Sequence, residues 1–327
     1  MFMNKNNECK YFYLKMKSNL LSIYQQQKPL TAWLSLLFIV ANIMPVTATP
    51  LPLANQPLIM AQNQTAVERV NQGIQFIQQG KLQDAIAAFR QASQIEPKLA
   101  SAHYNLGLAL RQAGQLQASA DAFYQATQAD PNFALAYANL GAALLEGNNL
   151  QQAREYLGKA LELDSKLGVA NYNLGLVLAR QGEIPQAIAA FDQAIRLSPK
   201  APEPAYHLGV AHLQSGNVEE AKKAFQKAIQ ISPKYPEAHY NLGSIFLNQG
   251  NLDKALEAFR KAAEANSNYA NAYYGAGLVF LRQNRYKDAQ QVLQYAKDLY
   301  VTQGNTSWAA NTEQLLQRSR NSNSQLP

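Results

Sequence analysis

The amino-acid sequence predicts an all-α fold in which helical hairpins stack into a solenoid, and three observations lead to this prediction. Glycine recurs at an interval of 34 residues from position 73 to position 277. A small residue follows twelve positions after each glycine, and a bulky apolar residue follows four positions later still. Between these landmarks apolar residues recur at spacings of three and four, the pattern of a helix with one buried face. The glycines are Gly73, Gly107, Gly141, Gly175, Gly209, Gly243 and Gly277.

Each period contains two amphipathic segments separated by a turn, and the turn carries glycine or asparagine, which turns favour. Glycine in mid-helix costs about 0.5–1 kcal/mol relative to alanine. Its recurrence therefore implies that a bulky neighbour packs directly against the backbone. The turn residues are Gly80, Gly114, Asn148, Gly182, Gly216, Gly250 and Asn284. The bulky residues are Phe89, Phe123, Leu157, Phe191, Phe225, Phe259 and Leu293.

The unit resembles the tetratricopeptide repeat, which has the same length of about 34 residues and the same Leu-Gly, Ala-x-x-x-Phe and Pro landmarks. The second unit reads ASAHYNLGLALRQAGQLQASADAFYQATQADPNF. The resemblance implies an α-solenoid in which each hairpin packs on its neighbours. It also implies a role in binding other proteins, without specifying which. The seven units are residues 66–99, 100–133, 134–167, 168–201, 202–235, 236–269 and 270–303.

Residues 304–327 are predicted to close the array with a capping helix and a polar tail. Thr306 or Ser307 can cap the helix, which we expect to span residues 306–318, with the tail starting at Ser319. The side chains that would share its buried face are Trp308, Thr312, Leu315 and Leu316.

Residues 1–48 are predicted to be a signal peptide or an N-terminal anchor. Lysines precede an apolar run over residues 30–43, which is short for a membrane span of about 20 residues but suits an export signal. Cleavage is expected after Ala48, with Ala61 as a second candidate and Met16 as an alternative start. Residues 49–65 then form a Pro-rich spacer. We therefore expect the protein to be exported to a bacterial periplasm, a thylakoid lumen or the outside of the cell. The alternatives are that it is anchored in the membrane or that it stays in the cytosol.

Charge and cysteine usage narrow the possible partners. The formal net charge is +7, but residues 1–61 hold five lysines and one acid, which leaves 24 basic and 21 acidic residues beyond them. A net charge of +3 with mixed signs argues against nucleic acid as a partner. The single cysteine, Cys9, excludes a disulfide within the chain. His207 and His212 are five residues apart, unlike a metal pair at i, i+4, so no metal and no cofactor are expected.

The resemblance places a peptide-binding groove on the concave surface formed by the first helix of each hairpin. Residues three before each glycine, and one and five after it, share that face. A column of tyrosines there would give a partner a large contact area, and a row of asparagines could hold a peptide backbone. Alternatively, these tyrosines pack between helices and these asparagines bond to the neighbouring hairpin or their own helix. The candidate residues are Tyr104, Asn105, Leu108, Asn139, Tyr172, Asn173, Arg180, Tyr206, Tyr240, Asn241 and Tyr274.

The sequence carries no phosphate-binding loop and no recognisable set of catalytic side chains, so we expect no enzyme activity. The predicted function is a scaffold or adaptor that binds an extended peptide or a partner helix in the concave groove. Three alternatives remain open at this point. The protein could be a membrane-tethered assembly factor for an envelope or photosynthetic complex, or a substrate-recruiting subunit of a separate enzyme. As the third alternative, it could bind through its convex face or through the ends of the array, including self-association.

Overall fold

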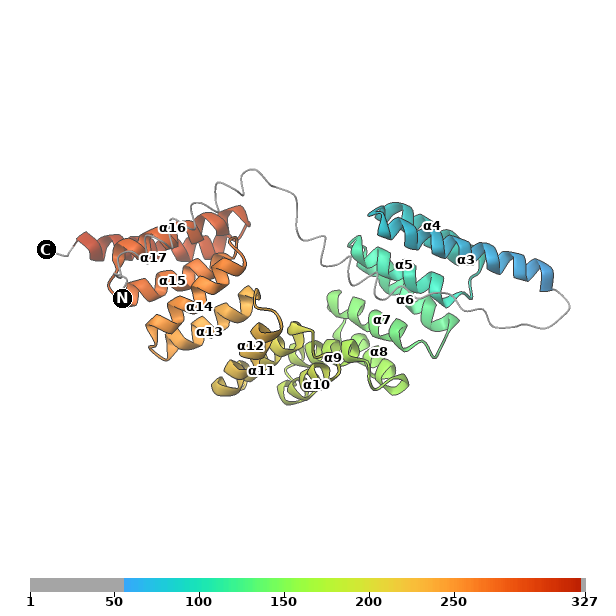
Figure 1. The fold of residues 1–327 in the computed structure, drawn as a ribbon, viewed down its shortest axis with the longest axis horizontal. Coiled ribbons are helices and arrows are strands. Elements are labelled where there is room, and N and C mark those ends of the chain that lie inside the picture. The colour runs from blue at the N-terminus through green and yellow to red at the C-terminus, as the bar shows by residue number, and fades with distance from the viewer. Residues whose placement is uncertain (1–55, 325–327) are drawn as a thin grey trace. The chain divides into compact units, whose positions relative to one another are not determined.

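The computed structural model describes residues 56–324, which form fifteen helices and no strand (Figure 1). They divide into two compact units between Pro199 and Lys200, called here the N-terminal block and the C-terminal block. The N-terminal block contains α3 (Gln56–Gln78), α4 (Leu82–Ile95), α5 (Ala100–Gln112), α6 (Leu116–Ala129), α7 (Ala134–Glu146), α8 (Leu150–Leu163), α9 (Gly168–Arg180) and α10 (Ile184–Leu197). The C-terminal block contains α11 (Pro202–Gln214), α12 (Val218–Ile231), α13 (Pro236–Asn248), α14 (Leu252–Ala265), α15 (Ala270–Arg282), α16 (Tyr286–Thr302) and α17 (Thr306–Ser324).

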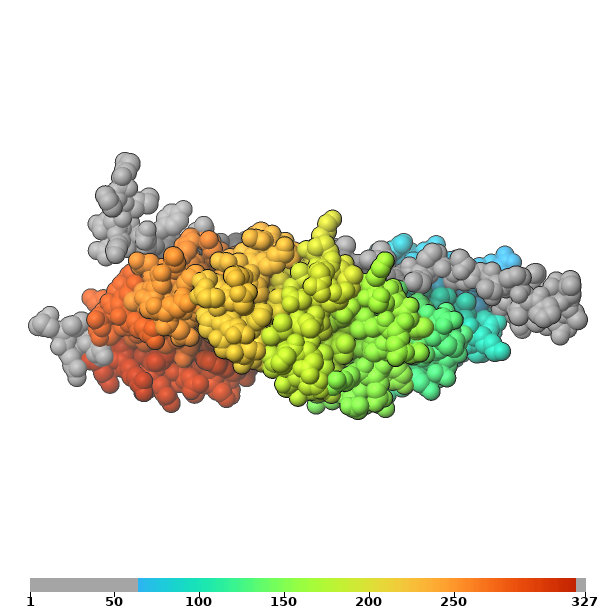
Figure 2. Space-filling model, turned by 90° about the horizontal axis from the view of Figure 1, so that it is seen from below, coloured from blue at the N-terminus to red at the C-terminus, as the bar shows by residue number. Residues whose placement is uncertain are grey.

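Consecutive helices pair into antiparallel hairpins, and each hairpin packs on the next one in its block. In the N-terminal block the pairs are α3 with α4, α5 with α6, α7 with α8, and α9 with α10. In the C-terminal block they are α11 with α12, α13 with α14, and α15 with α16, after which α17 packs on α16. Figure 2 shows the helices of the C-terminal block, yellow through red, packed closely in chain order. The prediction of an all-α solenoid of tetratricopeptide-type hairpins is confirmed.

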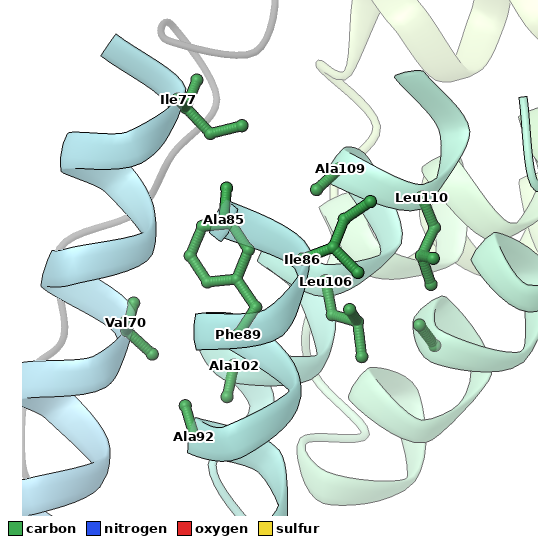
Figure 3. Packing of buried hydrophobic residues seen from close by; sticks show 11 residues of the cluster. Val70, Ile77, Ala85, Ile86, Phe89, Ala92, Ala102, Leu106, Ala109 and Leu110 are labelled. Carbon is green, nitrogen blue, oxygen red and sulfur yellow. The ribbon is translucent and has the colours of Figure 1, made fainter. Parts of the chain in front are cut away.

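The recurring glycine lets the two helices of a hairpin approach each other. A Cβ added at Gly107 would lie 2.7 Å from Cδ1 of Phe123, which is fully buried on the paired helix. The other six glycines of this column meet the bulky residue of their own hairpin in the same way. Figure 3 shows the first instance: Phe89 of α4 points toward α3, between Val70 and the next hairpin.

The turns within hairpins use the left-handed backbone region. Gly114 has φ +73° and Asn148 has φ 60°, a conformation that glycine adopts freely and asparagine tolerates better than most residues. The chain then reverses at once, and the amide of Gln115 donates to the carbonyl of Leu110 at 2.9 Å.

The ends of the array differ from the expected boundaries. Helix α3 begins at Gln56, so the last ten residues of the segment expected to be a spacer, 56–65, are helical. Pro57 permits this because proline is tolerated in the first turn, where no amide hydrogen is needed. Helix α17 continues to Ser324, so the first six residues of the expected tail, 319–324, are also helical. Ser319 is buried, and its hydroxyl donates to the carbonyl of Leu316 at 2.7 Å.

The predicted signal or anchor, residues 1–48, lies outside the described residues. Among the helices that are described, none has both the length and the apolar character needed to cross a bilayer.

Candidate peptide-binding face

The first helices of adjacent hairpins contact one another, as α3 does α5, α7 does α9, and α13 does α15. They therefore share one face of each block, called here the first-helix face. The predicted tyrosines lie on these helices, and all of them except Tyr274, whose hairpin carries Leu293 at that position, pack against the phenylalanine of their own hairpin. The ring centroids are 5.7 Å apart for Tyr104 and Phe123, 6.2 Å for Tyr172 and Phe191, 5.8 Å for Tyr206 and Phe225, and 5.6 Å for Tyr240 and Phe259.

The next hairpin supplies a second aromatic neighbour at several of these positions. Phe133, which ends the loop before α7, lies 4.8 Å from Tyr104, and Tyr235 lies 5.2 Å from Tyr206. Tyr269 meets Tyr240 edge-on at 5.9 Å. The tyrosines therefore contribute to packing between hairpins, whatever surface they also offer.

Exposure divides the candidate residues into two groups. Tyr104, Asn105 and Leu108 are buried on α5, and Asn173 is buried on α9. These four residues are at most 8% exposed and so offer little contact surface to a partner. The reason at Tyr104 is local, because Phe133 and the next helix cover its ring. Tyr172, Tyr206, Tyr240 and Tyr274 are half-buried, and each leaves part of its surface open to solvent.

Two of the four candidate asparagines, Asn139 and Asn241, direct their amide hydrogens inward. Asn139 donates from Nδ2 to the carbonyl of Leu135 on its own helix at 2.9 Å and to the hydroxyl of Tyr104 at 3.3 Å. Asn241 repeats this arrangement in the C-terminal block, where its Nδ2 donates to the carbonyl of Glu237 at 2.8 Å and its side chain bonds to the Tyr206 hydroxyl. At Asn139 and Asn241 these contacts are those of the internal role, whereas the buried amide of Asn105 has no hydrogen-bond partner within the described residues.

The arginines link neighbouring hairpins. Arg180 donates from Nη1 to the carbonyl of Leu145 at 2.9 Å, and Arg282 donates to the carbonyl of Leu247 at 2.7 Å. Each carbonyl belongs to the last turn of the preceding first helix, where carbonyls lack a helical partner. Arg180 therefore caps α7, and its guanidinium is already engaged.

The C-terminal block carries an aromatic strip on the first-helix face. We define it as the four rings in one column at 34-residue spacing, namely Tyr206, Tyr240, Tyr274 and Trp308. Trp308 is 39% exposed, meets Tyr274 edge-on at 5.3 Å and stacks on Tyr300 at 5.9 Å. Helix α17 thus takes the place of the first helix of an eighth unit.

Sequence reasoning treated Trp308 only as part of the cap and did not place Tyr235, Tyr269 or Tyr300 beside the tyrosine column. The signal for Trp308 was present, because position 308 is one period beyond Tyr274. The other three follow only from packing, since they lie in the loops and in α16.

Burial and one carboxylate raise the pKa values of tyrosine hydroxyls in and beside this strip. Burial raises the pKa of the Tyr206 hydroxyl, the Glu237 carboxylate raises it further, and the hydrogen bond with Asn241 lowers it. Burial raises the pKa of Tyr269 to about 12, against a lowering by Asn271, and Glu237 again adds to the rise. Glu237 therefore lies within electrostatic range of two rings of this surface.

Two histidines in equivalent positions have structural contacts. The Nε2 atoms of His103 and His239 lie 2.9 Å from the carbonyls of Pro97 and Pro233, in the loops preceding their helices. In the described part of the chain, no three His, Cys, Asp or Glu side chains are grouped so that they could hold a metal ion.

Comparison with known proteins agrees with this architecture. The family model described as the cilia and flagella-associated protein 70 C-terminal domain, a tetratricopeptide-repeat family, matches residues 59–273, or 215 of the 327 residues. A search of curated proteins found no significant match.

Two solved structures with TM-scores above 0.5 share the fold. A tetratricopeptide repeat protein from Parabacteroides merdae is 19% identical with a TM-score of 0.60, covering 76% of this chain and 99% of its own. PilF of Pseudomonas aeruginosa is 18% identical with a TM-score of 0.57, covering 65% and 97%. YrrB, described as a protein with an unusual peptide-binding site, is 28% identical with a TM-score of 0.48, covering 60% and 99%.

Proposed function

The chain belongs to the tetratricopeptide-repeat family represented by the C-terminal domain of cilia and flagella-associated protein 70, and from this premise we propose that it is a non-catalytic adaptor. Proteins built from such repeats present extended binding surfaces to other proteins. The proposed ligand is an extended peptide segment or a helix of a partner, held on the first-helix face of the C-terminal block.

The observation that carries the proposal is the aromatic strip. Its four rings lie at one position of four successive units, and its last ring, Trp308, is 39% exposed. Tyrosine and tryptophan dominate binding energy at protein interfaces because they contribute large area and few rotors. The N-terminal block supports this role less well, since Tyr104 is fully buried and Ala138 occupies the next position of the column.

Alanine substitution of the strip tests the proposal. Peptides would first be selected from a random display library for binding to the full chain. Their affinity for the full chain would then be compared with their affinity for the Tyr206→Ala, Tyr240→Ala and Tyr274→Ala triple variant. We expect binding to weaken at least tenfold, because each of these rings leaves open surface on the strip. A triple leucine variant retains apolar packing at the three positions, so that a loss of binding in it is not due to misfolding. Circular dichroism follows the helical content of both variants.

The matched control is Tyr124→Ala on α6, a second helix, where the side chain is 41% exposed. Equal loss of binding in this control, or undiminished binding in the triple variant, would contradict the placement of the site. Affinity purification from the native organism, followed by mass spectrometry, would then identify the physiological partner.

We also propose that the protein is exported and cleaved after Ala48. Cleavage after Ala61 would remove the first six residues of α3, Gln56–Ala61, whereas cleavage after Ala48 leaves the helix whole. The competing possibility is an uncleaved anchor through residues 30–43, which would make the protein a tethered assembly factor. N-terminal sequencing of the mature protein separates the two, because a start at Thr49 excludes the anchor and a retained apolar run excludes cleavage.

A further inference from the structure

Two carboxylates accompany the aromatic strip. Glu203 precedes Tyr206 by three residues on α11, and Glu237 precedes Tyr240 by three residues on α13. Residues three apart on a helix share a face, so each carboxylate lies beside a ring of the strip. Both side chains are partly exposed.

Neither carboxylate forms an ion pair with a basic side chain of the described residues. Lys200 and Lys234 precede the two helices in exposed turns and pair with neither glutamate. The arginine on the first-helix face, Arg282, is engaged by the carbonyl of Leu247.

The N-terminal block lacks this combination. The positions that correspond to Glu203 and Glu237 in its four units are Ser101, Leu135 and Val169, together with Val67 in the first unit. None of these carries charge, and the tyrosine beside Ser101 is buried. Negative charge next to accessible rings is thus a property of the C-terminal block.

We propose that the aromatic strip binds an extended peptide segment whose lysine or arginine side chains pair with Glu203 and Glu237 and lie over the neighbouring rings. This inference rests on the proposed adaptor function and specifies the chemistry of the partner. A cation gains both from a carboxylate and from the face of a tyrosine or tryptophan ring. An acidic peptide would meet two uncompensated carboxylates and be repelled.

The spacing of the two carboxylates also constrains the peptide. Glu203 and Glu237 stand one unit apart on α11 and α13, whose side chains meet where Asn241 bonds to the Tyr206 hydroxyl, and we take the separation of the two helices as about 10 Å. An extended chain covers that distance in about three residues. The basic residues are therefore expected at positions i and i+3 of the bound segment.

The test selects peptides from a random display library on the full chain and then measures synthetic peptides by fluorescence anisotropy. The defined probes carry lysine at i and i+3, glutamine at both positions, or glutamate at both. The Glu203→Gln, Glu237→Gln double variant is nearly isosteric and removes only charge. The matched control, Glu219→Gln with Glu220→Gln on α12, removes the same charge from surface ion pairs with Lys222 and Lys223.

We expect the selected peptides to be enriched in basic residues. The lysine probe should bind about ten- to a hundredfold more weakly to the double variant than to the wild type, because two charge-assisted contacts are lost. Its affinity for the control variant should be unchanged. Added salt should weaken binding to the wild type more than to the double variant.

Three results overturn the inference. The first is that the selected peptides are not enriched in basic residues. The second is that the glutamate probe binds as tightly as the lysine probe or more tightly, and the third is that the lysine probe binds the double variant as well as it binds the wild type. If peptides without basic residues bind and the triple tyrosine variant loses them, the adaptor function stands and this inference alone fails. If no peptide is selected, or if binding survives in the triple tyrosine variant, the proposed site on the strip fails with it.

Discussion

At Gly107 the backbone of α5 lies against the ring of Phe123, and this contact makes a prediction with a definite sign. A Cβ added there would stand 2.7 Å from the ring, closer than side chains pack. Gly107→Ala should lower stability by about 1–3 kcal/mol through overpacking, although alanine is the better helix former. Thermal unfolding followed by circular dichroism measures the change.

Gly158 of α8 supplies the opposite case. It lies inside a helix, and nothing comes within 4 Å of a Cβ added there. Gly158→Ala should therefore raise stability by about 0.5–1 kcal/mol. If both substitutions shifted the thermal midpoint in the same direction, close packing would not be the reason for the repeated glycine.

The buried tyrosines predict how stability depends on pH. Burial raises the pKa of Tyr269 to about 12 in the folded chain, whereas a tyrosine in the unfolded chain titrates near 10. Between these values the unfolded state loses the proton that the folded state retains, so stability falls as pH rises from about 10 to 12. Below pH 10 this contribution is fully present.

The measurement is the thermal midpoint against pH from about 9 to 11.5. Tyr269→Phe should flatten the decline, because phenylalanine has no proton to lose. Tyr124→Phe, at a ring that is 41% exposed, serves as the control and should follow the wild type. Identical slopes in all three proteins would mean that Tyr269 titrates in the folded state as it does in the unfolded one.

At the scale of the element, α17 stabilises the last hairpin mainly through apolar contact. Leu316 is 1% exposed and packs in one cluster with Phe280 and Leu293. The ion pair between Lys297 and Glu313, at 2.9 Å, is partly exposed, so solvent screens it and its contribution to stability is small. Leu316→Ala should cost about 2–4 kcal/mol, which makes the apolar contact the dominant one.

Hydrogen exchange locates this effect, because stability in such arrays is local. Leu316→Ala should accelerate exchange of the α15 and α16 amides and leave α11 and α12 nearly unchanged. Gln317→Ala, on the exposed side of α17, should stay within about 0.5 kcal/mol of the wild type. Uniform acceleration over the whole C-terminal block would show that the cap does not act locally.

The elements were predictable from sequence wherever periodicity decided them. The seven glycines gave the phase of every hairpin, since each must meet the Phe or Leu of its own unit. The array's ends were not predictable, because outside the period only local signals remain. Residues 49–65 were predicted to be a Pro-rich spacer, although Pro57 occupies the first turn of α3, and Ser319 was predicted to begin the polar tail, although it is buried.

The candidate site was less predictable, for the same physical reason. Helical geometry places Tyr104 and Tyr240 at equivalent positions, but their exposure depends on the residue that the next loop brings over each ring. Phe133 helps to cover Tyr104 completely, whereas Tyr240, which Tyr269 meets edge-on, keeps an open edge. Such differences come from contacts between hairpins, which a period does not reveal.

At the scale of the whole molecule, the period itself becomes testable. Contacts run between neighbouring helices and between first helices of adjacent hairpins, so one full unit should be removable from within a block. Deleting residues 134–167 joins Phe133 to Gly168 and places α9 on α6. Ala170, Leu174 and Val177 then take the positions of Ala136, Leu140 and Ala143, and Asn173 takes that of Asn139 beside Tyr104.

This shortened chain should stay folded with unchanged helical content per residue, while its thermal midpoint falls because two interfaces become one. Deleting residues 134–150 instead removes half a period and sets the second helix α8 where a first helix belongs. The buried residues of α8 then no longer meet their partners on α6. We expect this variant to lose cooperative thermal unfolding and to aggregate, as size-exclusion chromatography would show. If the two deletion variants behaved alike, the 34-residue phase would not be what holds the array together. If only the full-period deletion stays folded, the stability of the array depends on the register in which residues such as Phe123 and Gly107 meet.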